Sequence, residues 1–159
     1  MARNTSQPQS ALAVQLVSGT LVLSPIIQFA VLAALSLSGV MPEEGFASLG
    51  LPEGVLGGAA VVYAFVAAGL SFAVRPRIEN TMVTQAGPVL AGRMRTVLVS
   101  MAICESGAVV GFAVGLIGGG LLWPGIAMGI AVLGCARHFP SRQWLEMPAP
   151  GEGGRDAGA

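Results

Sequence analysis

Apolar residues along this chain form four long stretches that are separated by short polar or glycine-rich segments. The stretches cover Val17–Val40, Val55–Val74, Thr96–Ile117 and Leu121–Ala136. A helix needs about 20 apolar residues to cross a hydrocarbon core ~30 Å thick. Backbone groups in lipid must also be hydrogen-bonded within the protein. The pattern therefore predicts an all-α integral membrane protein, built as a bundle of four transmembrane helices.

Two of the stretches carry a proline. Pro25 lies inside the first one and predicts a tilt or kink there. Pro124 lies at the start of the fourth and shortest stretch, in the first turn of a helix, where a missing N–H costs little.

Composition strengthens the membrane interpretation. The chain of 159 residues is 53% hydrophobic and only 10% charged, with a mean hydropathy of +0.74. A soluble domain carries about 25% charged residues because its surface must be hydrated. Four apolar helices would leave a soluble bundle almost no polar face, so we expect the lipid bilayer to be the main partner.

The positions of the charges predict an orientation. All eight basic residues are arginines, and those that flank the apolar stretches lie in the second loop and after the last stretch: Arg75, Arg77, Arg93, Arg95, Arg137 and Arg142. The first loop holds only acidic charges, and the third is the uncharged segment Gly118–Gly120. Cationic loops stay in the cytoplasm. We therefore expect both termini to be cytoplasmic, in a membrane such as the bacterial inner membrane, and the zero net charge indicates no nucleic-acid partner.

The polar ends suggest a simple domain organisation. Residues 1–10 lack a hydrophobic pattern and are expected to form a disordered N-terminus. Residues 11–146 form the four-helix transmembrane domain, and residues 147–159, rich in glycine and proline, are expected to be a disordered tail. Trp144 is expected to anchor the chain at the membrane interface.

Glycines recur every four residues on the third and fourth stretches. They are Gly107, Gly111, Gly115 and Gly119 on the third and Gly125 and Gly129 on the fourth. This spacing places a stripe without side chains on one helix face, where another backbone can approach closely. Two interpretations remain open: the stripe packs the third and fourth helices of one chain together, or it joins copies of the chain or other membrane subunits. The first is favoured, because glycine is common in membrane helices.

Glu105 is the only acidic or basic residue well inside the four stretches. It follows Thr96 by nine residues, which is ~13 Å of helical rise and close to the bilayer midplane. A carboxylate there costs at least ~2.5 kcal/mol, and burial disfavours the ionised form. Glu105 is thus a candidate proton-binding residue. Possible polar partners are Ser106, Ser100, Cys104 and Gln28. The alternative is a neutral glutamic acid whose hydrogen bond joins two helices.

The remaining reactive residues predict no metal, cofactor or enzymatic site. Cys104 is expected at mid-depth and Cys135 near the cytoplasmic end, so we expect no disulfide and treat both as small packing residues. The single histidine, His138, is expected at the headgroup level and cannot form a zinc site alone. No nucleophile–base constellation or phosphate-binding loop occurs, so the chain is not expected to be an enzyme.

The stretch Arg93–Ile117 resembles the outer helix of the ring-forming subunit c of rotary ATP synthases. The shared features are a basic lead-in, an alanine three residues before the acid, and small residues after it: Arg95, Thr96, Ala102, Glu105, Ala108 and Gly111. The preceding glycine-containing stretch and Arg75-Pro76 fit more loosely, so that the resemblance covers about residues 54–117.

This resemblance implies that Glu105 binds and releases a transported ion, with Ser106 as a second contact. A glutamine on the preceding helix, which accompanies sodium binding in that family, is missing from the second stretch, so protons are expected rather than sodium. The chain departs from the family in three ways. It has one extra helix before and one after the helix pair that resembles subunit c, both of its termini are expected in the cytoplasm, and its glycines lie on the same helix as the acid.

Three hypotheses for function follow. The leading one is a small, oligomeric membrane protein related to subunit c that translocates protons through Glu105. The second is an accessory or assembly subunit in which the glycine faces dock another membrane protein. The third is a small proton-coupled exporter, which needs an aromatic-lined cavity. Tyr63 is the only aromatic residue with a polar group inside a stretch, and this counts against the exporter.

Overall fold

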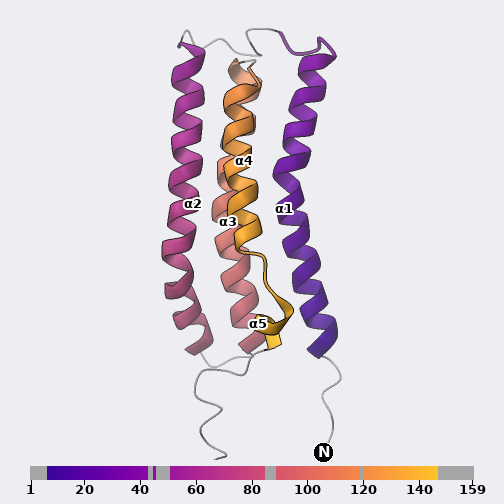
Figure 1. Ribbon diagram of the computed structural model, residues 1–159, viewed down its shortest axis with the longest axis vertical. Coiled ribbons are helices and arrows are strands. Elements are labelled where there is room, and N and C mark those ends of the chain that lie inside the picture. Colours follow the sequence, from indigo (N-terminus) through magenta and orange to yellow (C-terminus); the bar gives the residue numbers. More distant parts are fainter. Residues whose placement is uncertain (1–6, 43–44, 46–50, 85–88, 119, 147–159) are drawn as a thin grey trace, which may run out of the picture.

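The computed structural model describes residues 7–42, 45, 51–84, 89–118 and 120–146. All regular secondary structure in these residues is helical (Figure 1). The helices are α1 (Gln7–Leu37), α2 (Glu53–Thr84), α3 (Val89–Gly118), α4 (Leu122–Arg137) and α5 (Arg142–Glu146). The predicted all-α class is confirmed.

The helices match the apolar stretches but run further. Three segments are long and apolar enough to cross a membrane: Leu12–Leu37, Gly54–Thr81 and Ala91–Gly118. Helix α4 is a shorter apolar helix. The fold is therefore compatible with a multi-pass integral membrane protein. Helices α1, α2 and α3 are longer than their apolar stretches because a helix satisfies its own backbone hydrogen bonds in water as well as in lipid.

The expected disordered N-terminus differs in part, because α1 begins at Gln7 and residues 7–10 are helical. Pro8 is the second residue of α1, a position in the first turn where proline is tolerated. Helix α1 also continues through Pro25, and α2 through Pro76. Residues 1–6 and the expected tail at 147–159 lie outside the described residues.

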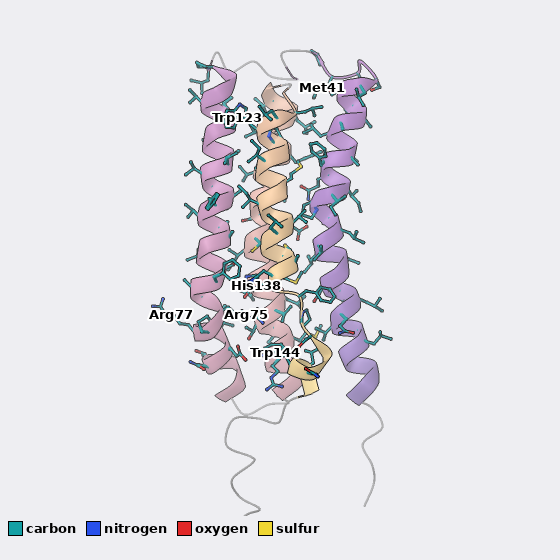
Figure 2. The ribbon with its side chains drawn as sticks, in the orientation of Figure 1. Met41, Arg75, Arg77, Trp123, His138 and Trp144 are labelled. Carbon is teal, nitrogen blue, oxygen red and sulfur yellow. The ribbon has the colours of Figure 1, made fainter. Side chains whose placement is uncertain are left out.

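Helices α3 and α4 form the centre of the bundle. Helix α2 packs against both of them on one side and α1 on the other, and α1 and α2 do not contact each other (Figure 1). The beginnings of α1 and α3, the end of α2, and α5 all lie at one end of the bundle, which we call the basic end because Arg75, Arg77, Arg93 and Arg95 lie toward it (Figures 1 and 2).

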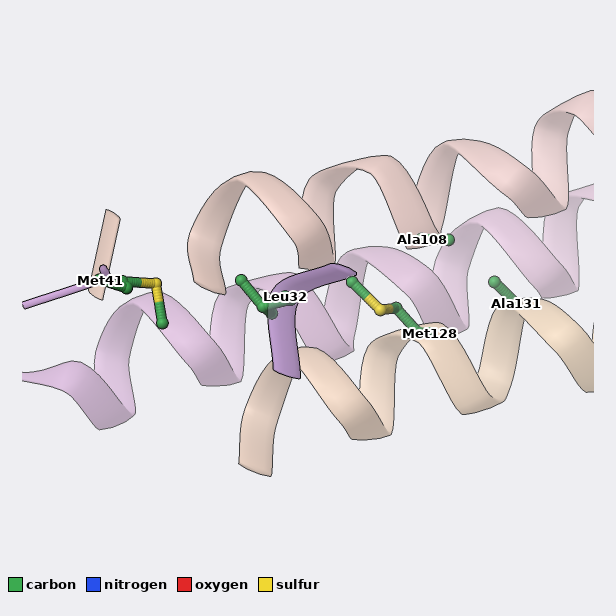
Figure 3. Packing of buried hydrophobic residues seen from close by; sticks show 5 residues of the cluster. All are labelled: Leu32, Met41, Ala108, Met128 and Ala131. Atoms are coloured by element: carbon green, nitrogen blue, oxygen red, sulfur yellow. The ribbon is translucent and has the colours of Figure 1, made fainter. Parts of the chain in front are cut away.

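Small side chains allow the helices to approach closely. Ala60 and Ala64 of α2 form a buried cluster with Ala127 of α4. A second cluster at the other side joins α1, α3 and α4, as Figure 3 shows; its buried members are Leu32, Met41, Ala108, Met128 and Ala131. The outer surfaces of α1 and α2 carry many exposed large apolar side chains, which is the surface that lipid would cover.

Candidate functional site

Glu105 lies in the middle of α3 and is half-buried. Helical spacing places it on the same face as Met94 and Phe112, which lie eleven residues before it and seven residues after it. Those two side chains pack against residues of α1, Met94 in a cluster with Val14 and Phe112 in a cluster with Leu32. Helical spacing thus places Glu105 on the face of α3 that is turned toward α1. It forms no hydrogen bond or ion pair with any residue that the structure describes.

The part of α1 that passes this level contains two polar residues. Leu21 and Val22 pack against a cluster around Met101, and Leu32 reaches Gly115, so the segment between them runs past Glu105. This segment holds Ser24 and Gln28. The Nε2 group of Gln28 donates to Ser24 Oγ at 3.2 Å, whereas Oε1 of Gln28 is buried and has no partner. An unpaired buried acceptor is costly, and a protonated carboxyl group is a donor that could satisfy it.

Ser106 turns to the opposite side of α3, toward α2. Its hydroxyl donates to Ile103 O at 2.7 Å and lies 3.2 Å from Tyr63 Oη, so the tyrosine is the donor in the second bond. The two hydrogen bonds of Ser106 thus go to α2 and to its own helix, α3. The structure therefore does not bring Ser106 and Glu105 into one site.

Tyr63 and Ser106 border an open groove between α2 and α3 of about 490 Å³. The remaining lining residues are apolar: Val66, Ala67, Leu70, Val99, Ala102 and Ile103. Tyr63 is the only aromatic residue among them. The groove therefore lacks the ring of aromatic side chains that a binding cavity for an exported drug-like substrate would need.

The glycines on α3 face other helices of the same chain. A Cβ atom added to Gly107 would lie 2.9 Å from the Cα atom of Ala64 in α2, and one added to Gly111 would lie 3.0 Å from Ala127 in α4. At Gly115 it would collide with the side chain of Leu32 in α1. All three positions thus face other helices of the same chain, but the expected packing of α3 on α4 accounts for only part of them, because Gly107 faces α2 and Gly115 faces α1 as well as Pro124 of α4.

The other glycines of the pattern behave differently. Gly125 of α4 faces Phe29 of α1, with 3.1 Å between an added Cβ atom and the ring. Gly129 is exposed and has no atom within 4 Å of the place of a Cβ. Gly119 lies outside the described residues. Of the six glycines, only Gly129 leaves a described, open surface for another molecule.

His138, directly after α4, is fully buried with an exposure of 0%. Its Nε2 atom lies 2.8 Å from Ser71 Oγ, and its Nδ1 atom lies 3.1 Å from a terminal nitrogen of Arg75. The ring stacks at a tilt on Phe72, with 4.6 Å between the ring centres. The expected depth of His138 at the headgroup level stays a prediction, and the structure adds that the ring is enclosed by protein, with Ser71, Phe72 and Arg75 of α2 around it. Sequence reasoning missed this cluster, whose only signal was a serine within an apolar helix.

The hydrogen bonds of the His138 ring determine its tautomer. A guanidinium group can only donate, so Nδ1 accepts a hydrogen from Arg75 and the proton of a neutral ring is on Nε2. Nε2–H then donates to Ser71 Oγ, whose own hydroxyl donates to Ala68 O at 2.6 Å. Cys104 also donates to Ser71 Oγ, at 3.0 Å. Both ring nitrogens of His138 and the hydroxyl group of Ser71 thus have hydrogen-bond partners.

Helix α5 covers the basic end of the bundle, below the buried cluster around His138 (Figure 2). The buried Arg93 donates to the main-chain oxygen of Trp144 at 2.7 Å and to that of Leu145 at 3.4 Å. The indole of Trp144 also lies near two guanidinium groups, 5.3 Å from Arg93 and 5.4 Å from Arg75, as in cation–π pairs.

Replacement of Arg93 by methionine is expected to release α5 from the bundle, because two main-chain acceptors and one cation–π contact are lost together. In a Trp123→Phe background, where Trp144 is the sole tryptophan, its emission should shift to the red and its quenching by acrylamide should increase. The matched change Arg95→Met removes an exposed arginine of the same helix and should leave both signals unchanged. Equal signals in the two variants would show that Arg93 does not hold α5.

The two cysteines are both free, and both are buried, with exposures of 1% for Cys104 and 0% for Cys135. The expectation that Cys104 and Cys135 lie at different depths along the bundle is wrong. They belong to one buried cluster with Met101, and the thiol of Cys135 donates to the main-chain oxygen of Met101 at 3.6 Å. The cause is the direction of α4, which runs back along α3 and places Cys135 beside Cys104. No group of three His, Cys, Asp or Glu side chains is gathered anywhere in the described ranges.

Comparison of the chain with protein-family models, with curated proteins and with solved structures finds no match.

Proposed function

We propose that this chain is a four-span membrane protein in which Glu105 binds and releases a proton as part of proton translocation. The observation that carries the proposal is the half-buried carboxyl group of Glu105 in the middle of an apolar helix, without a hydrogen bond or ion pair among the described residues. An intramembrane acid kept as a structural link would need such a bond. Acids inside membrane helices that lack a structural partner commonly serve ion pathways.

Gln28 supports the same proposal. When protonated, the carboxyl group of Glu105 can donate to the unpaired Oε1 of Gln28 across the boundary of α1 and α3. When ionised, it has no hydrogen to donate, and two acceptors then face the same boundary. With Nε2 of Gln28 donating to Ser24 Oγ, the free Oε1 can pair with the protonated carboxyl group and not with the ionised one, which is the property that a reversible proton-binding site needs.

The arrangement favours a site that works within a single bundle. In a subunit c ring the acid is carried on a helical hairpin, and a relationship to that family is supported here only by the residues around Glu105. Helix α3 is covered by α1, α2 and α4, so its glycines are already used within the chain. Cytoplasmic termini are supported by the arginines at the basic end, which would face the cytoplasm.

The test is labelling of the purified protein in liposomes with an apolar carbodiimide over a pH series, because such reagents attack protonated carboxyl groups in apolar surroundings. We expect an adduct on Glu105 near neutral pH that fades in alkali and is absent in Glu105→Gln. Gln28→Leu should reduce the labelling at neutral pH, because the neutral acid loses its acceptor. Gln15→Leu, a change elsewhere in α1, is the matched control and should label like the unmodified protein.

Proton uptake by the same liposomes completes the test. A pH-sensitive dye inside them should report a proton flux that Glu105→Gln abolishes. If Glu105 is never labelled while exposed acids react, the site is not protonated and the proposal fails. If Glu105 is labelled but no flux is found, the acid is neutral without transporting anything, and an assembly role with Glu105 as a packing residue replaces the proposal.

A further inference from the structure

Three sulfur-containing residues lie in one buried cluster within the bundle and are not used by the site around Glu105. Cys104 and Met101 of α3 and Cys135 of α4 belong to one buried group, and all three are 0–1% exposed. The thiol of Cys104 occupies the space beside Gly134, where an added Cβ would come within 2.8 Å of its sulfur. The absence of a side chain at Gly134 therefore lets the sulfur of Cys104 reach α4 beside Cys135.

We propose that Cys104, Cys135 and Met101 form a binding site for Cu(I). Thiolate and thioether sulfurs are soft ligands that select this ion over harder ones. Zinc sites require about four ligands of the cysteine, histidine or carboxylate types. The described residues gather no three of those types, so two thiols and a thioether suit a soft ion of low coordination number.

The charge of the complex suits its surroundings. A thiol must lose its proton to bind as a thiolate. Cu(I) held by one thiolate, one thiol and the thioether of Met101 is electrically neutral, and one proton passes to the cytoplasmic water. A neutral complex avoids the high cost of an unpaired charge inside the membrane. No electron is transferred, because copper enters and remains as Cu(I).

Neighbouring residues hold the ligands in place. Cys104 donates to Ser71 Oγ at 3.0 Å, and Cys135 donates to the main-chain oxygen of Met101 at 3.6 Å. When Cys104 binds the metal as a thiolate, the hydroxyl of Ser71 can turn and donate to the sulfur instead. Ser71 is thus a positioning residue of the kind that commonly surrounds metal ligands.

A route from the basic end is provided by a second thioether. Met94 lies seven residues before Met101, on the same face of α3 and nearer to Arg93. It packs in the cluster beneath α5, next to Trp144. A Cu(I) ion could pass from Met94 to Met101 and then to the thiols by exchange of sulfur ligands.

The experiment is a competition titration of the purified, reduced protein in lipid nanodiscs against a coloured Cu(I) chelator. We expect one Cu(I) per chain, and about equal occupancy with Ag(I), which is soft and inert to oxidation. Cys104→Ala and Cys135→Ala should abolish the bound copper at chelator concentrations that the unmodified protein withstands. Met101→Leu and Ser71→Ala should weaken binding by about 10–100-fold, the range for supporting partners of a metal ligand.

Met128→Leu is the matched control, because Met128 is also buried but belongs to the cluster around Leu32. It should bind copper like the unmodified protein. Protection of the two thiols from a maleimide by Cu(I) in the unmodified protein gives a second readout that needs no variant. The proposal is overturned if the unmodified protein loses all copper to the chelator, if the cysteine variants retain it, or if Zn(II) protects the thiols as well as Cu(I) does.

Discussion

Replacement of His138 by alanine is expected to lower the free energy of unfolding by about 2–5 kcal/mol, the range for truncating a buried side chain of similar size. The ring is fully buried and bridges α2 to the end of α4 through Ser71 and Arg75. Its loss leaves a cavity beside Phe72 and removes the acceptor that Arg75 uses inside the bundle. Reversible unfolding in mixed detergent micelles, followed by circular dichroism, measures the change.

Phe139→Ala is the control for this prediction. Phe139 is the next residue along the chain and is 43% exposed, so its truncation should change the stability by much less. His138→Gln keeps a side-chain acceptor and donor and should recover part of the loss. If His138→Ala unfolds at the same detergent fraction as the unmodified protein, the hydrogen bonds and packing of the His138 ring are not a major source of stability.

Replacement of Gly107 by leucine is expected to separate α2 from α3 and to cost about 1–3 kcal/mol or more, as overpacking of a close interface does. A Cβ atom at this position would lie 2.9 Å from the Cα atom of Ala64. A main-chain atom cannot move aside without moving its helix. At Gly115, in contrast, the nearest atoms belong to the flexible end of Leu32 and the next to the side chain of Pro124 at 3.0 Å, and no main-chain atom obstructs, so the change to alanine there should be milder.

The matched control is Gly129→Leu on α4. Nothing lies within 4 Å of the added Cβ atom and the position is exposed, so the stability of one bundle should hardly change. The same variant also tests self-association, since Gly129 is the open glycine of the described stripe. Loss of a dimer in light scattering with Gly129→Leu, at unchanged stability, would locate an interface between copies on α4. Equal stability losses in the two glycine variants would contradict the packing argument.

The chemistry of the candidate site was readable from the sequence to different degrees. Glu105 was identifiable because an acid in an apolar stretch is costly. Ser106 was placed beside it because the two are adjacent and because the resemblance to subunit c implied a second contact, but adjacent residues of a helix point about 100° apart, and the structure directs Ser106 to Tyr63 instead. Gln28 was one of several polar candidates, and the sequence could not show that its Oε1 is buried without a partner.

The sequence alone determined that the chain is helical and suited to a membrane. Long apolar stretches must satisfy their backbone groups locally, and only helices do so within a single segment. It also located the acid in the third helix, whereas the arginines that it placed in the second loop lie within α2 and α3, because both helices continue beyond the apolar stretches. These features depend on neighbours within one segment, which the order of residues specifies directly.

Only the tertiary structure decided which polar groups meet. His138 and Ser71 are 67 positions apart, and Cys104 and Met101 meet Cys135 only because α4 returns along α3. The register and rotation of one helix on another result from the interlocking of small residues, such as Gly107 on Ala64. A helix that is apolar on all sides has no preferred face in its sequence, so the packing of the bundle determines which side chains become partners.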